Sequence, residues 1–174
     1  MRIALWSSGR RTNDILPLRL TEMTTILLLQ GANMAYLGKR EPVIYGTTSA
    51  AELDAMLRRH AKERGVKLEI HYTHIEGQAI ERIYRAADEM IDGLLMNPAG
   101  FSYAGYALRD CLRSIPFPYV EVHISNIERR GIKSVTAETA RGVIAGFGLQ
   151  SYVMGLDALL QIIGGREPAK KAKR

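Results

Sequence analysis

From residue 23 onward, short apolar runs of strand length alternate with amphipathic helical patterns, and this alternation constrains the fold more than any other feature of the chain. Each run is followed by a helix or a loop, which is typical of a parallel sheet with helices on both faces. The sequence therefore predicts an α/β fold around a five-stranded parallel sheet. The expected strands are residues 24–30, 66–73, 93–96, 119–123 and 142–147.

The helices have recognisable boundaries. Ser49-Ala-Ala-Glu52 is a capping-box sequence and predicts the start of the first helix, which Gly65 is expected to end. Further helices are expected from Gly77 through Ala87, near residues 104–114 and over about residues 150–163.

The chain of 174 residues is short enough to form one domain. Its net charge of +6 comes from the ends: residues 1–22 contribute +2 and residues 166–174 contribute +4, which leaves residues 23–165 neutral. We expect residues 23–165 to form the folded domain, residues 1–22 to be a disordered or docking extension, and residues 166–174 to be a disordered basic tail. A neutral body gives no reason to predict nucleic-acid binding.

Cys111 is the single cysteine, which excludes a disulfide framework and a cysteine-based metal site. The longest apolar run near the start, residues 26–29, is far too short to cross a bilayer. No signal-peptide cleavage pattern follows it. We expect a cytoplasmic protein without a membrane partner.

Polar segments follow three of the expected strands. They are residues 30–46, the Asn97-Pro98 segment, and residues 121–126. In open parallel sheets, ligands bind at the carboxyl ends of the strands. We therefore expect these three segments to meet at one end of the sheet and to form the functional site.

These segments, together with one more, resemble the type II 3-dehydroquinate dehydratases in order and in spacing. The shared motifs are Gly31-Ala-Asn33, Leu37-Gly-Lys-Arg40-Glu-Pro-Val-Ile-Tyr45-Gly46, Asn97-Pro98, Ala107-Leu-Arg-Asp110 and Glu121-Val-His123-Ile-Ser-Asn126. The resemblance spans about residues 24–160. It implies a flavodoxin-like three-layer sandwich, a homo-oligomer of trimers forming a dodecamer, and a lyase without cofactor or metal that interconverts 3-dehydroquinate and 3-dehydroshikimate.

Elimination of water from a β-hydroxy-ketone needs a base, a stabiliser for the enolate and an acid. Tyr45 is the candidate base. Because a phenol ionises near pH 10, it needs a nearby cation, and Arg40 on the same loop is the candidate. Asn33 is the candidate donor to the enolate oxygen, directly or through water. His123 is the candidate acid.

Other residues are candidates for binding the substrate. Asn97 would orient the substrate or the histidine. By resemblance, the backbone of Ile124 and Ser125 would hold the substrate carboxylate, and Asp110 would reach the site of a neighbouring subunit.

Each candidate also has a structural interpretation. Asn33 and Asn97 are typical turn residues, Tyr45 and Arg40 fit an exposed loop, and Asp110 fits a surface ion pair. A histidine at a strand end is often structural. The Glu121-x-His123 pair suggests a metal site, but no third ligand lies nearby in the sequence.

The chain departs from the family pattern where that family contacts the ring hydroxyls of its substrate. Tyr103 stands where the family has a histidine, and the loop after Asn126 is a few residues shorter. Arg130 matches the first arginine of that loop, whereas the second has only Lys133 nearby.

Three hypotheses follow. The chain is a divergent 3-dehydroquinate dehydratase in which Tyr103 supplies the missing hydrogen bond and Arg130 binds substrate. Alternatively, it performs the same elimination on a different hydroxy-keto carboxylate. The third hypothesis is a non-catalytic ligand-binding protein on the same fold.

Overall fold

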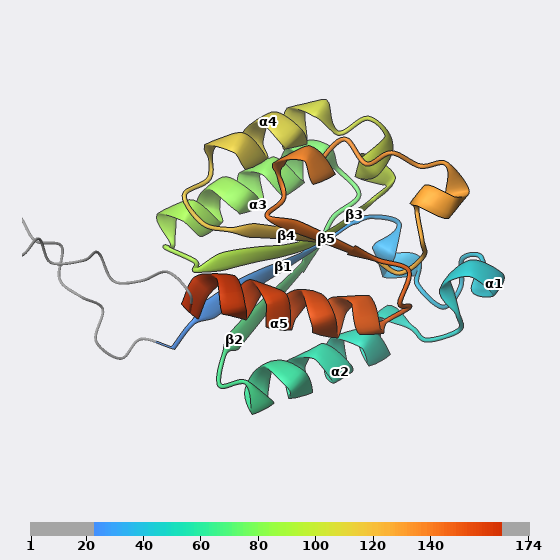
Figure 1. Ribbon diagram of the computed structural model, residues 1–174, viewed down its shortest axis with the longest axis horizontal. Helices are drawn as coiled ribbons and strands as arrows, with labels where there is room; N and C mark the ends of the chain where they lie inside the picture. Colours follow the sequence, from blue (N-terminus) through green and yellow to red (C-terminus); the bar gives the residue numbers. More distant parts are fainter. Residues whose placement is uncertain (1–22, 165–174) are drawn as a thin grey trace, which may run out of the picture.

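The computed structural model describes residues 23–164, and a twisted sheet lies in it between two layers of helices (Figure 1). All neighbouring strands are parallel, and their order is β2-β1-β3-β4-β5. This is the strand order of flavodoxin-like folds, so the expected fold class is confirmed. The strands are β1 (Thr25–Ala32), β2 (Lys67–Tyr72), β3 (Gly93–Ala99), β4 (Tyr119–His123) and β5 (Gly142–Ala145).

Two helices cover each face of the sheet. On one face lie α2 (Ala50–Glu63) and α5 (Gln150–Gly164), and on the other α3 (Glu76–Asp88) and α4 (Tyr106–Ser114) (Figure 1). The expected capping box is present at the start of α2, where Ser49 and Glu52 exchange hydrogen bonds. The loops contain the short helices α1 (Pro42–Tyr45), η1 (Met34–Tyr36), η2 (Gly100–Tyr103), η3 (Glu128–Arg130) and η4 (Ala137–Thr139).

The central strand β1 is apolar on both faces because both faces are buried. Ile26 and Leu28 pack into the apolar layer beneath α2 and α5, whereas Leu27 and Leu29 pack into the layer beneath α3 and α4. All four side chains are fully buried. A parallel sheet covered on both faces requires this continuous apolar run.

β1 and β3 continue further than the sequence predicted. The third strand was expected to end at Met96 but runs through Pro98 to Ala99. β1 likewise extends past Gly31, where an added Cβ would lie 2.1 Å from the carbonyl oxygen of Pro98. Only glycine permits this close approach, which extends the strand pair to the ends that form the site.

The last strand is shorter than predicted. It was expected to reach Phe147 but ends at Ala145. Gly146 (φ 94°) and Gly148 (φ 59°) adopt left-handed conformations and turn the chain into α5.

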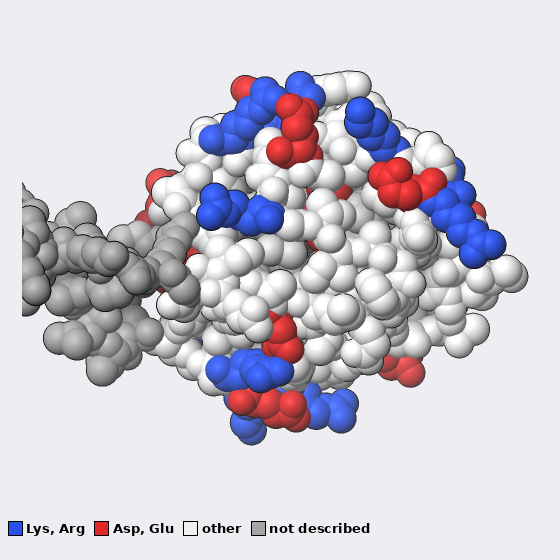
Figure 2. All heavy atoms as spheres, viewed as in Figure 1, with Lys and Arg blue, Asp and Glu red and all other residues white. Residues whose placement is uncertain are grey.

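Charged side chains of both signs lie close together on the face seen in Figure 2, and a broad uncharged area lies between them over α5 and β5. Within residues 23–164, no helix has both the length and the apolar character needed to cross a membrane. The expectations for residues 1–22 and for the basic tail lie outside the described residues.

Candidate active site

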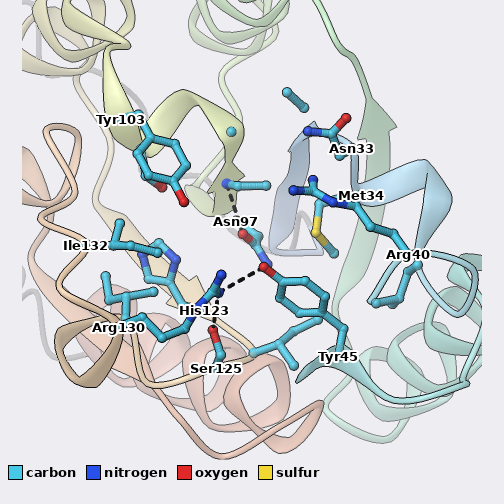
Figure 3. A pocket seen from close by; sticks show the side chains of 17 residues that line it. Asn33, Met34, Arg40, Tyr45, Asn97, Tyr103, His123, Ser125, Arg130 and Ile132 are labelled. Carbon is cyan, nitrogen blue, oxygen red and sulfur yellow. Dashed lines mark hydrogen bonds between the residues drawn. The ribbon is translucent and has the colours of Figure 1, made fainter. Parts of the chain in front are cut away.

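A cavity of about 270 Å³ opens at the carboxyl ends of β1, β3 and β4 (Figure 3). The polar segments that follow these strands therefore meet at one end of the sheet. Asp110 lies apart from this cavity, exposed on α4. The cavity brings together the other sequence-predicted site residues, which are Asn33, Arg40, Tyr45, Asn97, Tyr103, His123, Ile124, Ser125 and Arg130.

The hydroxyl of Tyr45 faces the guanidinium of Arg130 (Figure 3). Nη1 of Arg130 donates to the Tyr45 oxygen at 2.9 Å and to Oγ of Ser125 at 3.0 Å. The hydrogen bond with Tyr45 is the main reason why the pKa of Arg130 is raised above its usual value. The permanent positive charge of the Arg130 guanidinium therefore lies next to the phenol oxygen.

Arg40 does not make this contact. It lines the cavity, but its Nε lies 3.1 Å from Oε2 of Glu41. The sequence suggested Arg40 because it is five residues from Tyr45. Between them the chain turns at Glu41 (φ 43°) into α1, so closeness in the sequence does not bring the guanidinium to the phenol. Arg130, at the end of η3, takes that position.

His123 is held by a buried carboxylate. Its Nε2 lies 2.7 Å from Oε1 of Glu121, which points to the same face of β4 two residues earlier. The other carboxylate oxygen of Glu121 accepts hydrogen bonds from Tyr119 and, at 2.7 Å, from Thr136. All four residues are buried.

Glu121 remains ionised in this setting. Burial alone would raise its pKa, but the hydrogen bonds that the carboxylate accepts, first among them the one from His123, outweigh burial and hold the pKa below its usual value. An ionised Glu121 keeps a proton on Nε2 of His123 and leaves Nδ1 for proton exchange with a bound molecule.

Asn33 directly follows β1 in a left-handed conformation, with φ of 78°. Its backbone N–H donates to Nδ1 of His74 at 3.0 Å. His74 lies just after β2, so this hydrogen bond ties the turn after β1 to the neighbouring strand. The turn brings the Asn33 side chain to the cavity.

Ile124 and Ser125 follow β4 and line the cavity. Neither backbone N–H donates to another group within the described residues. Together with the guanidinium groups of Arg40 and Arg130, these free donors suit an anionic oxygen group.

The Glu121–His123 pair is too small a set for a metal site. Within residues 23–164, no group of three or more histidine, cysteine, aspartate or glutamate side chains is placed to share a metal ion.

Sequence reasoning missed two groups at the site. Glu121 was considered only as a metal ligand, although a carboxylate in an apolar strand must be paired, and its i, i+2 spacing to His123 places both on one face. Ser102 also lines the cavity, and its buried hydroxyl has no partner among the described residues. No signal in the sequence distinguishes Ser102 from an ordinary loop serine.

The fold and the cavity define a flavodoxin-like α/β protein with acid–base groups at the carboxyl ends of its strands. The family model described as "Dehydroquinase class II" matches residues 24–160. The chain belongs to the class II dehydroquinase family.

Individual relatives agree with this assignment. The chain is 41% identical over 143 residues to a 3-dehydroquinate dehydratase of Thioalkalivibrio sulfidiphilus, covering 80% of this chain and 97% of the relative. It is 42% identical over 147 residues to the enzyme of the same name from Anoxybacillus flavithermus, covering 83% of this chain and 99% of the relative.

Solved structures give the same result. The type II dehydroquinase of Butyrivibrio crossotus superposes with a TM-score of 0.76 at 36% identity, over 79% of this chain and 98% of that one. A 3-dehydroquinate dehydratase-like protein from Bifidobacterium longum has a TM-score of 0.62 at 28% identity, over 82% of this chain and 99% of that one.

Proposed function

We propose that residues 23–165 form a hydro-lyase that eliminates water from 3-dehydroquinate to give 3-dehydroshikimate. The observation that supports this most strongly is the shared cavity of two pairs, Tyr45 with Arg130 and His123 with Glu121. One pair suits a base and the other an acid, as the elimination requires.

Tyr45 is the base in this proposal. Its phenolate takes the proton from the carbon next to the ketone, and the electron pair of that C–H bond moves to form the enolate. The guanidinium of Arg130, at 2.9 Å, stabilises the phenolate by charge and by a hydrogen bond. Arg40 adds a second positive charge to the same cavity.

The enolate oxygen needs a donor that is in place before the reaction. Asn33 supplies it, directly or through a water molecule, because its side chain lines the cavity and its backbone is fixed by His74. Asn97 orients the substrate from the floor of the cavity.

His123 is the acid. In its protonated form it donates to the β-hydroxyl, the C–O bond breaks, water leaves and the enolate electrons form the C=C bond. The carboxylate of Glu121 holds the imidazole in place at 2.7 Å. Tyr45 then carries the proton from carbon, and transfer of one proton through solvent to His123 restores both groups.

Ile124 and Ser125 would bind the substrate carboxylate through their free backbone N–H groups. Arg130 would also contact the substrate, since it lines the cavity. Tyr103 would donate to a ring hydroxyl in place of the family's histidine.

A second candidate is the same elimination on a different hydroxy-keto carboxylate. In the sequence, Lys133 is the basic residue nearest to the position of the family's second loop arginine. It lines the neighbouring groove rather than the cavity. The groups that face ring hydroxyls are thus Tyr103 and the unpaired Ser102, a changed set.

The test is to add purified protein to 3-dehydroquinate and to follow the conjugated enone by ultraviolet absorbance. Turnover supports the first candidate. No turnover, combined with elimination from a related hydroxy-keto acid, supports the second. Calorimetric binding without any elimination would contradict both and leave a binding protein.

We also propose that the chain assembles into trimers that form a dodecamer. The edge strand β5 exposes Val143, and with Phe147 and Met154 it borders a groove beside the cavity. Exposed apolar side chains gathered in one area mark an association surface. Asp110, exposed on α4, would contact a neighbouring subunit's cavity.

Light scattering tests this assembly. Phe147→Lys is expected to give smaller particles than the wild type, because a charge would be buried at the contact. Tyr84→Lys is the control, since Tyr84 is similarly exposed on α3 but lies outside the groove. A monomeric wild type at micromolar concentration would contradict the proposal.

A further inference from the structure

Three buried polar side chains form a chain of hydrogen bonds that leads from the core to the floor of the cavity. Nδ2 of Asn97 donates to the hydroxyl of Tyr152 at 2.8 Å, and that hydroxyl lies 2.7 Å from Oε1 of Gln30. Tyr152 and Gln30 are fully buried and do not line the cavity, whereas Asn97 does. Tyr152 lies on α5, and Gln30 pairs with Asn97 across β1 and β3.

The direction of each hydrogen bond follows from one backbone donor. The N–H of Ala99 lies 3.1 Å from the side-chain amide of Asn97, and an N–H can only donate, so the amide oxygen faces it. The amide nitrogen must then face Tyr152, whose oxygen accepts. The single hydroxyl proton of Tyr152 is left for Gln30, which presents its oxygen.

The orientation of Gln30 leaves one of its own polar atoms without a hydrogen bond. Its Nε2 is buried and has no partner among residues 23–164. Leaving a buried N–H without a partner costs free energy. The orientation of the Gln30 amide has this cost, and it places the amide oxygen where it accepts the hydrogen bond from Tyr152. Apolar side chains of similar size would fill the same space without leaving a donor unpaired, so packing alone gives no reason for this arrangement.

We propose that Tyr152, itself fixed by Gln30, is a positioning residue that holds the Asn97 amide in the orientation that the N–H of Ala99 selects. This inference rests on the proposed function. The amide oxygen is occupied by Ala99 and one N–H by Tyr152, which leaves the second N–H for a group in the cavity. Asn97 therefore has one free N–H, and the substrate atom that contacts this N–H is an acceptor oxygen.

The first test is Tyr152→Phe, which removes one oxygen atom and keeps the ring. KM for 3-dehydroquinate is expected to rise about tenfold with kcat changed less than threefold, because a contact made equally in ground state and transition state is weakened. The same change made in an Asn97→Ala background is expected to alter KM little, since the two residues act through one contact. An unchanged KM in Tyr152→Phe, or full additivity in the double variant, would overturn the inference.

Two further variants separate positioning from stability. Ile26→Val lies in the same apolar layer at the far end of β1 and is expected to lower Tm while KM stays unchanged. Gln30→Met keeps the length of the side chain but removes the acceptor for the Tyr152 proton, and KM is expected to rise as in Tyr152→Phe, by a smaller factor. A fall in Tm without any change in KM in both Tyr152→Phe and Gln30→Met would show a structural role alone.

A crystal structure of Tyr152→Phe decides the inference even if the wild type does not act on 3-dehydroquinate, a result that would count against the proposed function instead. The expected result is an Asn97 amide that has moved from its wild-type position, because the contact that holds its nitrogen is lost. An Asn97 amide in its wild-type position and contacts would contradict the positioning role.

Discussion

The hydroxyl of Tyr45 lies 2.9 Å from Nη1 of Arg130, a residue 85 positions further along the chain. The guanidinium carbon also lies 5.6 Å from the centre of the Tyr45 ring. The phenol proposed as the base and a cation that never loses its charge are thus brought together by the folding of two distant loops.

Arg130 should therefore matter more to the chemical step than Arg40. We expect Arg130→Gln to lower kcat about 100-fold, because the phenolate loses the charge that stabilises it. Arg40→Gln, whose guanidinium contacts Glu41 instead, is the matched variant and should lower kcat less. Steady-state kinetics on both variants measures this, and a larger kcat loss in Arg40→Gln would show that the pairing seen here is not the one used in catalysis.

The lowered pKa of Glu121 makes the stability of the fold depend on pH. Its pKa is lower in the folded protein than the ordinary value of 4.5, so its contribution is fully present above that pH and is lost as the pH falls through the folded pKa. We expect Glu121→Gln to destabilise the protein at pH 7 by about 1–3 kcal/mol, because a buried set of donors loses its charged acceptor.

The measurement is thermal unfolding from pH 7 down to pH 3. The difference in stability between the wild type and Glu121→Gln should become smaller below pH 4.5. Glu138→Gln is the control, since this exposed carboxylate pairs with Arg109 and Arg113 at the surface and should change stability by less than about 1 kcal/mol. A constant difference in stability over the whole range would mean that folding does not lower the pKa of Glu121.

Tyr103 tests the recognition of the substrate. Its side chain is 61% exposed but lines the cavity. We expect Tyr103→Phe to raise KM about 5- to 10-fold and to leave kcat nearly unchanged, because a hydroxyl that binds a ring oxygen contributes to ground state and transition state alike. Tyr36→Phe is the control, being equally exposed and outside the cavity. An unchanged KM in Tyr103→Phe would remove Tyr103 from substrate binding.

Asp110 tests the assembly through activity. If it completes the site of a neighbouring subunit, Asp110→Ala and Tyr45→Phe are each expected to be impaired as pure proteins. Co-expression of the two variants should restore part of the activity, because mixed assemblies contain sites with both an intact Tyr45 and an intact neighbouring Asp110. Activity no higher than the mean of the two pure variants would place Asp110 outside the site.

The sequence predicted the sheet because its signals are local. A run such as residues 26–29 has to be buried on both faces, and a capping box at Ser49 starts a helix wherever it occurs. The extension of β3 through Pro98 was missed because it depends on the contact between Gly31 and Pro98, which are 67 positions apart.

The candidate site could be predicted as a set of residues but not as a set of pairs. Strand ends converge by a rule of parallel sheets, so Asn33, Asn97 and His123 were expected together. The partner of Tyr45 depends on the path of the loop after β4, which has no periodic pattern. Similarly, the contact between Asn97 and Tyr152 requires knowing how α5 packs on the sheet.

Turnover of 3-dehydroquinate by Tyr45→Phe tests the role of the phenol most directly. The variant lacks only the oxygen atom that faces Arg130. We expect kcat to fall by about 10²- to 10⁴-fold while calorimetry still detects binding of 3-dehydroshikimate. Wild-type turnover in this variant would contradict it, since another group would then remove the proton from carbon.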